Sequence, residues 1–254
     1  MPFWQHWSCS IFDPMKKLFD KDEVLFAVLW IVIYVMAFSL ADGVSDAIGI
    51  PKGITVVAGL ALSLTLTGFL RRNQLLGYVG LQGKVKRSGM LGYVPLAVVT
   101  TVPLWAGVQM PASLWQSVLG VISMCFVGFL EEVIFRGFLF KSMAKTNLKA
   151  AVIVSSLTFG MGHAINLLMG APLVDTLLQL VYASAAGFCF TAIFCAGGSI
   201  LPCILSHALL NSLSVFGAET TASGQIIISA VQTLVNLGYG FWLFHQNRKG
   251  AKAE

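Results

Sequence analysis

The chain has 254 residues, of which 57% are hydrophobic and only 11% are charged, and its mean hydropathy is +0.82. Soluble domains carry about 25% charged residues. A chain with this composition lacks the charge to cover a water-facing surface, which disfavours a soluble protein with a very large core. The net charge of +5 comes mostly from residues that flank apolar segments, so it favours a role in membrane topology and argues against nucleic acid as a partner.

Eight apolar segments are candidates for helices that cross the bilayer, for which about 20 residues are needed. Their apolar runs are continuous rather than alternating, which favours helices over a β-barrel. In chain order the predicted spans are Val24–Leu40, Ile54–Leu70, Leu91–Val108, Leu114–Phe140, Leu148–Met169, Thr176–Cys195, Leu201–Phe216 and Ile226–Phe244. Leu201–Phe216 is short for a span and contains polar side chains. We predict an all-α polytopic membrane bundle that forms a single domain over residues 1–254.

Basic residues test this count, because they form four clusters that lie on one side of the membrane if there are eight spans. The clusters are Lys16, Lys17 and Lys21; Arg71, Arg72, Lys84, Lys86 and Arg87; Lys141, Lys145 and Lys149; and Arg248, Lys249 and Lys252. The opposite loops contain Lys52 as their only basic residue, with Asp42, Asp46, Asp175 and Glu219. Cytoplasmic loops are enriched in lysine and arginine, so both termini are predicted to be cytoplasmic. The chain's size and lack of targeting extensions favour a prokaryotic plasma membrane.

Ionisable residues inside the predicted spans are few. A charge at the bilayer centre costs about 2.5 kcal/mol or more, so each is a functional candidate. Glu131, Glu132 and Arg136 lie in the sequence EEVIFRG. Residues four apart share a helix face, so Glu132 and Arg136 can neutralise each other. Glu131 has Phe135 at that spacing, which leaves its carboxylate free to face a cavity and take a proton. Alternatively, all three charges form one buried network that fixes helix packing.

Two histidines and an asparagine lie in later spans. His163 follows Gly160 and Gly162, which let a helix or a substrate backbone approach closely. His207 and Asn211 share a helix face, from which they can donate hydrogen bonds to an oxyanion or bind a metal ion. The alternative for each is a hydrogen bond between helices. Their positions within the spans place these groups and Glu131 at or below the midplane, toward the cytoplasm.

Three motifs in this order resemble those of the CAAX-protease and bacteriocin-processing family of intramembrane proteases. EEVIFRG at 131–137 matches the pattern EExxxR, FGMGH at 159–163 matches FxxxH, and HALLN at 207–211 matches HxxxN. Each motif lies on a separate predicted span. The resemblance covers residues 91–217 in detail and the rest of the chain only as hydrophobic helices.

The resemblance implies a role for each motif residue. Glu131 is expected to act as the general base that activates a water molecule, which His163 helps to bind and orient. His207 and Asn211 are expected to stabilise the tetrahedral oxyanion. The supporting residues, which hold the architecture or pack beside the water, are Glu132, Arg136 and Phe159.

Family members have been described both as metalloproteases and as glutamate proteases. The sequence lacks the HExxH signature of zincins, and we favour a mechanism without a metal cofactor. If a divalent metal such as zinc takes part, the predicted ligands are Glu131, His163 and His207.

The predicted function is therefore that of an endopeptidase that cuts a membrane-embedded or lipidated peptide or protein within the lipid bilayer. The alternative is a non-proteolytic membrane scaffold or bacteriocin-immunity factor that binds a peptide in the same pocket. A third interpretation is a transporter with a polar site at the midplane, which the lack of inverted repeats disfavours.

Overall fold

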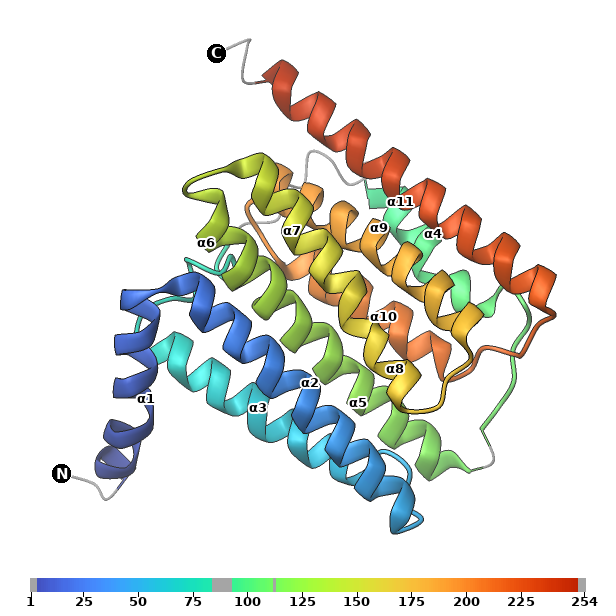
Figure 1. The fold of residues 1–254 in the computed structure, drawn as a ribbon, viewed down its shortest axis with the longest axis horizontal. Helices are drawn as coiled ribbons and strands as arrows, with labels where there is room; N and C mark the ends of the chain where they lie inside the picture. Colours follow the sequence, from blue (N-terminus) through green and yellow to red (C-terminus); the bar gives the residue numbers. More distant parts are fainter. Residues whose placement is uncertain (1–3, 84–92, 112, 251–254) are drawn as a thin grey trace.

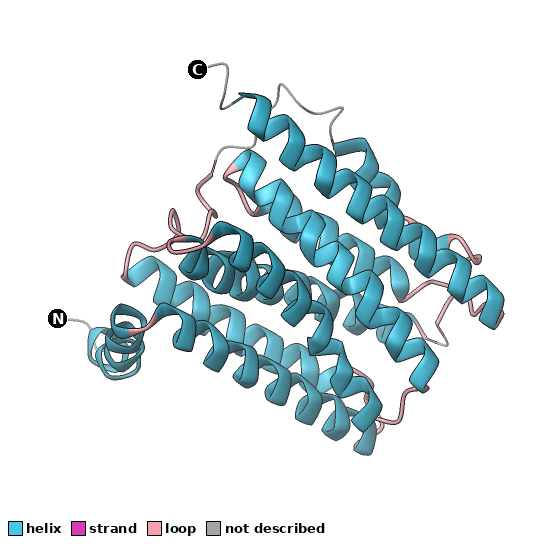
Figure 2. Cartoon of the chain, turned by 45° about the horizontal axis from the view of Figure 1, so that its top comes forward, coloured by secondary structure: helices cyan, strands magenta, loops and turns pink. Residues whose placement is uncertain are grey.

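The protein is described by a computed structural model that covers residues 4–83, 93–111 and 113–250. Every regular element in these ranges is helical (Figures 1 and 2), which confirms the predicted all-α class. The helices are α1 (Trp4–Lys21), α2 (Glu23–Ala47), α3 (Gly53–Arg72), α4 (Val94–Thr100), α5 (Leu114–Glu132), α6 (Lys141–Ala144), α7 (Leu148–Met161), α8 (Ile165–Leu168), α9 (Leu173–Gly197), α10 (Leu201–Ser214) and α11 (Ala222–Gly250). A π-helical segment, Val133–Phe140, joins α5 to α6 without a break.

Six helical stretches of the described chain are long and apolar enough to cross a membrane. They are Glu23–Ala47, Gly53–Arg72, Leu114–Ala144, Leu148–Leu168, Leu173–Gly197 and Ala222–Asn247. Each one contains most or all of a predicted span. α10 is also apolar but has only 14 residues, in keeping with the short span predicted there.

The predicted span Leu91–Val108 differs from the structure. Its described part forms α4, which has 7 residues and a length of about 10 Å, followed by the 3-10 turn Val102–Leu104. Pro103 lacks the N–H that a continuing helix needs, and Gly107 has a φ of 119°, which no helix uses. Residues 91 and 92 lie outside the described ranges. The total of eight spans therefore stays a prediction.

The chain nevertheless runs from one end of the bundle to the other between consecutive helices (Figure 1). α3 ends beside α1, whereas α5 begins at the opposite end, so the segment that contains α4 connects the two ends. The segment before α5 is hydrogen-bonded to the segment that follows α10, because the Gln109 N–H donates to the Phe216 carbonyl at 2.8 Å. As a result, the start of α2 and the end of α11 lie at the same end of the bundle.

The outside of the bundle is apolar. On α2 alone, the exposed large hydrophobic residues include Val28, Leu29, Val32, Ile33 and Met36. Soluble monomers rarely expose continuous apolar surface of this extent. Lipid contact explains it, and the fold and the composition therefore agree on an integral membrane protein.

Small residues bring the functional helices close together, as is usual where helices pack in membranes. A Cβ atom added to Gly128 on α5 would come within 2.6 Å of the Ala208 backbone nitrogen on α10. One added to Gly160 on α7 would meet the Leu180 carbonyl oxygen on α9 at 2.6 Å. These contacts set the spacing of α5, α7, α9 and α10, which carry the site described below.

Candidate active site

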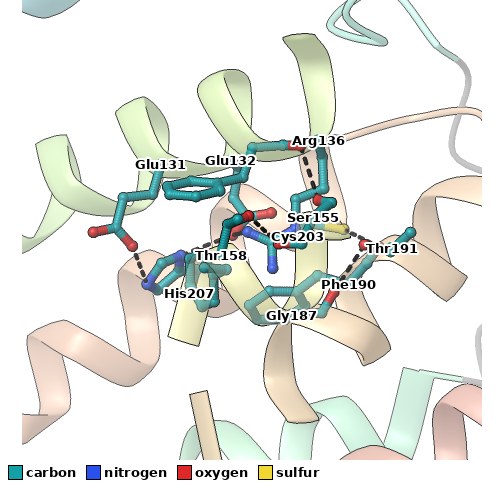
Figure 3. Close-up of polar contacts among 12 residues, drawn as sticks. Glu131, Glu132, Arg136, Ser155, Thr158, Gly187, Phe190, Thr191, Cys203 and His207 are labelled. Carbon is teal, nitrogen blue, oxygen red and sulfur yellow. Dashed lines mark hydrogen bonds and ion pairs between the residues drawn. The ribbon is translucent and has the colours of Figure 1, made fainter. Parts of the chain in front are cut away.

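Glu132 is the buried centre of a charged network between α5 and α10 (Figure 3). Its Oε1 accepts hydrogen bonds from Arg136 Nη1 at 3.1 Å and from His207 Nδ1 at 2.9 Å. The side chains of Glu132 and Arg136 are 0% exposed. The predicted pairing of Glu132 with Arg136 is thus confirmed. The sequence did not predict that His207 binds the same carboxylate oxygen.

Arg136 is stabilised by aromatic rings as well as by Glu132. Its guanidinium carbon lies 4.1 Å from the centre of the Phe159 ring and 5.4 Å from that of Phe190. A cation over an aromatic face is stabilised by the ring quadrupole, more strongly when water is excluded. This contact matters because Arg136 Nε and Nη2 have no hydrogen-bond partner among the described residues. Phe159 therefore both packs against Arg136 and lines the cavity described below.

Glu131 lies beside this network and is held from another helix. Its Oε1 accepts a hydrogen bond of 2.7 Å from the Tyr34 hydroxyl on α2. Its Oε2 lies 3.6 Å from His207 Nε2 and has no hydrogen bond within the described structure. Glu131 also lines a cavity, as the sequence predicted. One carboxylate oxygen is therefore fixed by Tyr34, and the other is buried next to His207 without a hydrogen bond.

His207 connects the two glutamates. Its Nδ1 is bound to Glu132 at 2.9 Å and its Nε2 lies toward Glu131 at 3.6 Å, as Figure 3 shows. The ring packs between Phe159 and Phe190, with ring centres 5.6 and 5.7 Å away. Because Glu132 accepts the Nδ1 proton, the imidazole is held in one orientation and Nε2 is directed into the site.

His163 approaches the cavity from the end of α7. Its Nδ1 lies 3.2 Å from the Phe159 carbonyl oxygen, so a proton on Nδ1 completes that hydrogen bond and leaves Nε2 as an acceptor. The His163 ring meets Phe159 edge-on, at 5.8 Å between ring centres. His163 lines the same cavity as Glu131, and so does Asn211, one turn after His207 on α10.

The cavity has a volume of about 720 Å³, which lies within the usual range of about 300–1,000 Å³ for ligand pockets. Its walls combine apolar side chains with many polar ones from different helices. The lining residues that matter for chemistry are Tyr34, Glu131, Phe159, His163, His207 and Asn211. The structure thus brings all four predicted catalytic residues to one cavity.

The alternative zinc ligands do not form a metal site in the described part of the chain. No group of three His, Cys, Asp or Glu side chains there is close enough to hold one ion. Glu131, His163 and His207 share the cavity, but they are not arranged as a ligand set. We therefore derive no step through a metal.

Two site residues escaped the sequence analysis. Tyr34 is 97 positions from Glu131, and its only signal was a hydroxyl within an apolar span. Phe190 gave no signal, because one aromatic residue among many in α9 has nothing to distinguish it. The π-helical segment Val133–Phe140 was also predicted as ordinary α-helix. Such segments are frequent at functional sites.

The fold and site together define a helical membrane protein whose buried acid–base groups surround a cavity. Residues 113–213 match the family model Rce1-like, described as type II CAAX prenyl endopeptidase Rce1-like. The match is shorter than half of the chain, but it extends from the N-cap of α5 into the last turn of α10 and includes all three motifs. It confirms the family resemblance and implies a membrane protease. No curated protein matches the chain.

Proposed function

We propose that the protein is an intramembrane endopeptidase that hydrolyses a peptide bond in a membrane-associated, hydrophobic or lipidated peptide. One observation carries this proposal: Glu131 lines a cavity with one carboxylate oxygen fixed by Tyr34 and the other without a hydrogen bond, 3.6 Å from His207 Nε2. That cavity also contains two histidines and an asparagine. The match of residues 113–213 to a CAAX endopeptidase family supports the same chemistry.

Glu131 acts as the general base. Its Oε2 takes a proton from a water molecule while the water oxygen bonds to the scissile carbonyl carbon, and the carbonyl π-electrons move to oxygen. The protonated Glu131 then donates that proton to the leaving nitrogen as the C–N bond breaks. General acid–base catalysis of this kind contributes about 10²- to 10⁴-fold. Tyr34 keeps the base in place through its 2.7 Å hydrogen bond.

His207 and Asn211 stabilise the oxyanion. His207 offers an N–H at Nε2 when it is doubly protonated, and the Asn211 amide offers N–H groups one helical turn away. Glu132 holds His207 Nδ1 at 2.9 Å, which orients the ring. Arg136 forms an ion pair with Glu132 at 3.1 Å. Donors fixed in place before the reaction are most effective in a site from which water is excluded.

His163 orients the attacking water. Its Nδ1 is engaged by the Phe159 carbonyl, which leaves Nε2 to accept a hydrogen bond from the water. The second proton of the water then faces Glu131. This division of roles gives the two histidines different chemistry: His207 donates to oxygen and His163 accepts from water.

The test is cleavage by the detergent-purified protein of a farnesylated CAAX peptide and a panel of hydrophobic peptide precursors, with products identified by mass. Wild type, Glu131→Gln and His163→Ala are compared with Glu23→Gln, a matched control at the start of α2, away from the cavity. Each is assayed with and without a chelator. Cleavage by wild type and Glu23→Gln, and its loss in the other two, supports the proposal.

Binding of the same peptides without any cleavage by wild type contradicts the proposal and supports the scaffold or immunity function. Inhibition by the chelator, reversed by added zinc, contradicts the preference for hydrolysis without a metal.

A further inference from the structure

The cavity is lined by residues from only one half of the bundle. From Glu131 its lining extends to the connections between α2 and α3 and between α10 and α11, where it includes Lys52, Glu219 and Thr220. Asp175, in the first turn of α9, lines it at the same end. Among the residues whose side chains are described, none from α1, α3 or α6 lines it. The cavity therefore reaches the surface at one end of the bundle.

Basic side chains gather at the other end. Among the residues whose side chains are described, they are Lys16, Lys17 and Lys21 on α1, Arg71 and Arg72 at the end of α3, Lys141 on α6, and Lys145 and Lys149 between α6 and the first turn of α7. Ion pairs hold this end together, with Arg72 3.0 Å from Asp13 and Lys145 2.5 Å from Glu23. At the cavity end, Lys52 is the single basic residue of the described chain, and it pairs with Asp42 at 2.8 Å.

These two observations together orient the cavity. The end of a membrane bundle that is rich in lysine and arginine faces the cytoplasm. We propose that the catalytic cavity opens at the extracytoplasmic face of the membrane and receives its peptide from that side. Glu131 itself remains near the midplane, because it is 13 residues before the end of the 31-residue stretch Leu114–Ala144.

The opening also indicates a substrate class, an inference that rests on the proposed function. Its lining contains the carboxylates Asp42, Asp175 and Glu219 but only one ammonium group, that of Lys52. Lys52 pairs with Asp42, so the net charge at the opening comes from Asp175 and Glu219, and a negatively charged opening attracts basic groups. The substrate expected here is an exported peptide, or the outer end of a membrane segment, that carries basic residues.

Orientation is tested by labelling single cysteines in intact cells with a membrane-impermeant maleimide. Thr220→Cys places a thiol at the opening, and Thr146→Cys, between α6 and α7, places a matched thiol at the basic end. The background carries alanine at positions 9, 125 and 195. Cys189 and Cys203 remain, because they are buried. Labelling in detergent first establishes that both introduced thiols react.

We expect Thr220→Cys to be labelled in intact cells and Thr146→Cys only after permeabilisation. The reverse pattern, or protection of both thiols in intact cells, overturns the proposed orientation. Labelling requires no catalysis, so this result is independent of whether the protein is a protease.

The charge preference is tested in detergent with two hydrophobic peptides that differ only by lysine or glutamate beside the cleaved segment. We expect faster cleavage of the lysine peptide and a smaller difference at 1 M salt, where the screening length falls to about 3 Å. Equal rates, or a preference for glutamate, overturn the substrate class. If neither peptide is cut although both bind, it is the proposed function that fails.

Discussion

Replacing Arg136 alone is expected to destabilise the protein more than replacing Arg136 and Glu132 together. Both side chains are 0% exposed, and they are 3.1 Å apart. Arg136→Met leaves the Glu132 carboxylate buried without its cation, which costs about 3–5 kcal/mol for a buried pair. The His207 Nδ1 at 2.9 Å can compensate in part, which places the expected cost at about 3 kcal/mol. Glu132→Gln alone leaves the Arg136 guanidinium buried without its anion, and we expect a similar loss of stability.

The double variant, Glu132→Gln with Arg136→Met, removes both charges and keeps an acceptor for His207. Its free energy of unfolding is expected to lie within about 1.5 kcal/mol of wild type, as for well-tolerated core replacements. The assay is equilibrium unfolding in mixed detergent micelles, followed by tryptophan fluorescence. The reasoning is refuted if the two single changes add up in the double variant, because residues in one network should couple by about 0.5–3 kcal/mol.

Three further predictions concern the geometry around Glu131. Tyr34→Phe removes a hydrogen bond to a charged group and should lower kcat by about 10- to 100-fold at unchanged KM, with a loss of stability of about 1–3 kcal/mol; a rise in KM alone would contradict a positioning role. Asn211→Ala removes an oxyanion donor and should lower kcat by about 10²- to 10³-fold, whereas a loss of less than tenfold would assign Asn211 to packing. Gly128→Ala puts a Cβ within 2.6 Å of the α10 backbone and should cost about 1–3 kcal/mol of stability and most of the activity. Its control, Gly238→Ala, meets no atom within 4 Å and should be neutral.

Local sequence spacing predicted the part of the site that depends on one helix at a time. Glu132 and Arg136 pair because residues four apart share a face, and Glu131 faces the cavity because its own helix offers it no cation. His207 and Asn211 reach the same cavity for the same reason. These predictions needed only helix geometry and the cost of burying charge.

Contacts between helices could not be predicted in the same way. The hydrogen bond from Tyr34 to Glu131 joins positions 97 residues apart, and it depends on how α2 packs against α5. The shared use of Glu132 Oε1 by Arg136 and His207 depends on the contact between Gly128 and Ala208. Helix periodicity specifies the face on which a side chain lies, but it does not specify the partner on another helix.

Hydropathy predicted the long helices better than the short ones. Thr176–Cys195 lies within α9, Leu173–Gly197, because a continuous apolar run has one stable form in lipid. The run Leu91–Val108 is equally apolar, but Pro103 and Gly107 interrupt its hydrogen bonding. Hydropathy did not predict α1, because one face of this helix is apolar and the other is charged. Phe19 is buried, whereas Lys16 and Asp20 form an exposed ion pair. Such a helix suits the membrane interface.

The most direct test of the account separates binding from cleavage in one variant. Glu131→Gln keeps the size of the side chain and its bond to Tyr34 but cannot take a proton. For a cleaved peptide, we predict an unchanged Kd in detergent and a single-turnover cleavage rate that falls by about 10²- to 10⁴-fold. A Glu131→Gln protein that cleaves at the wild-type rate would contradict the central claim that Glu131 activates water.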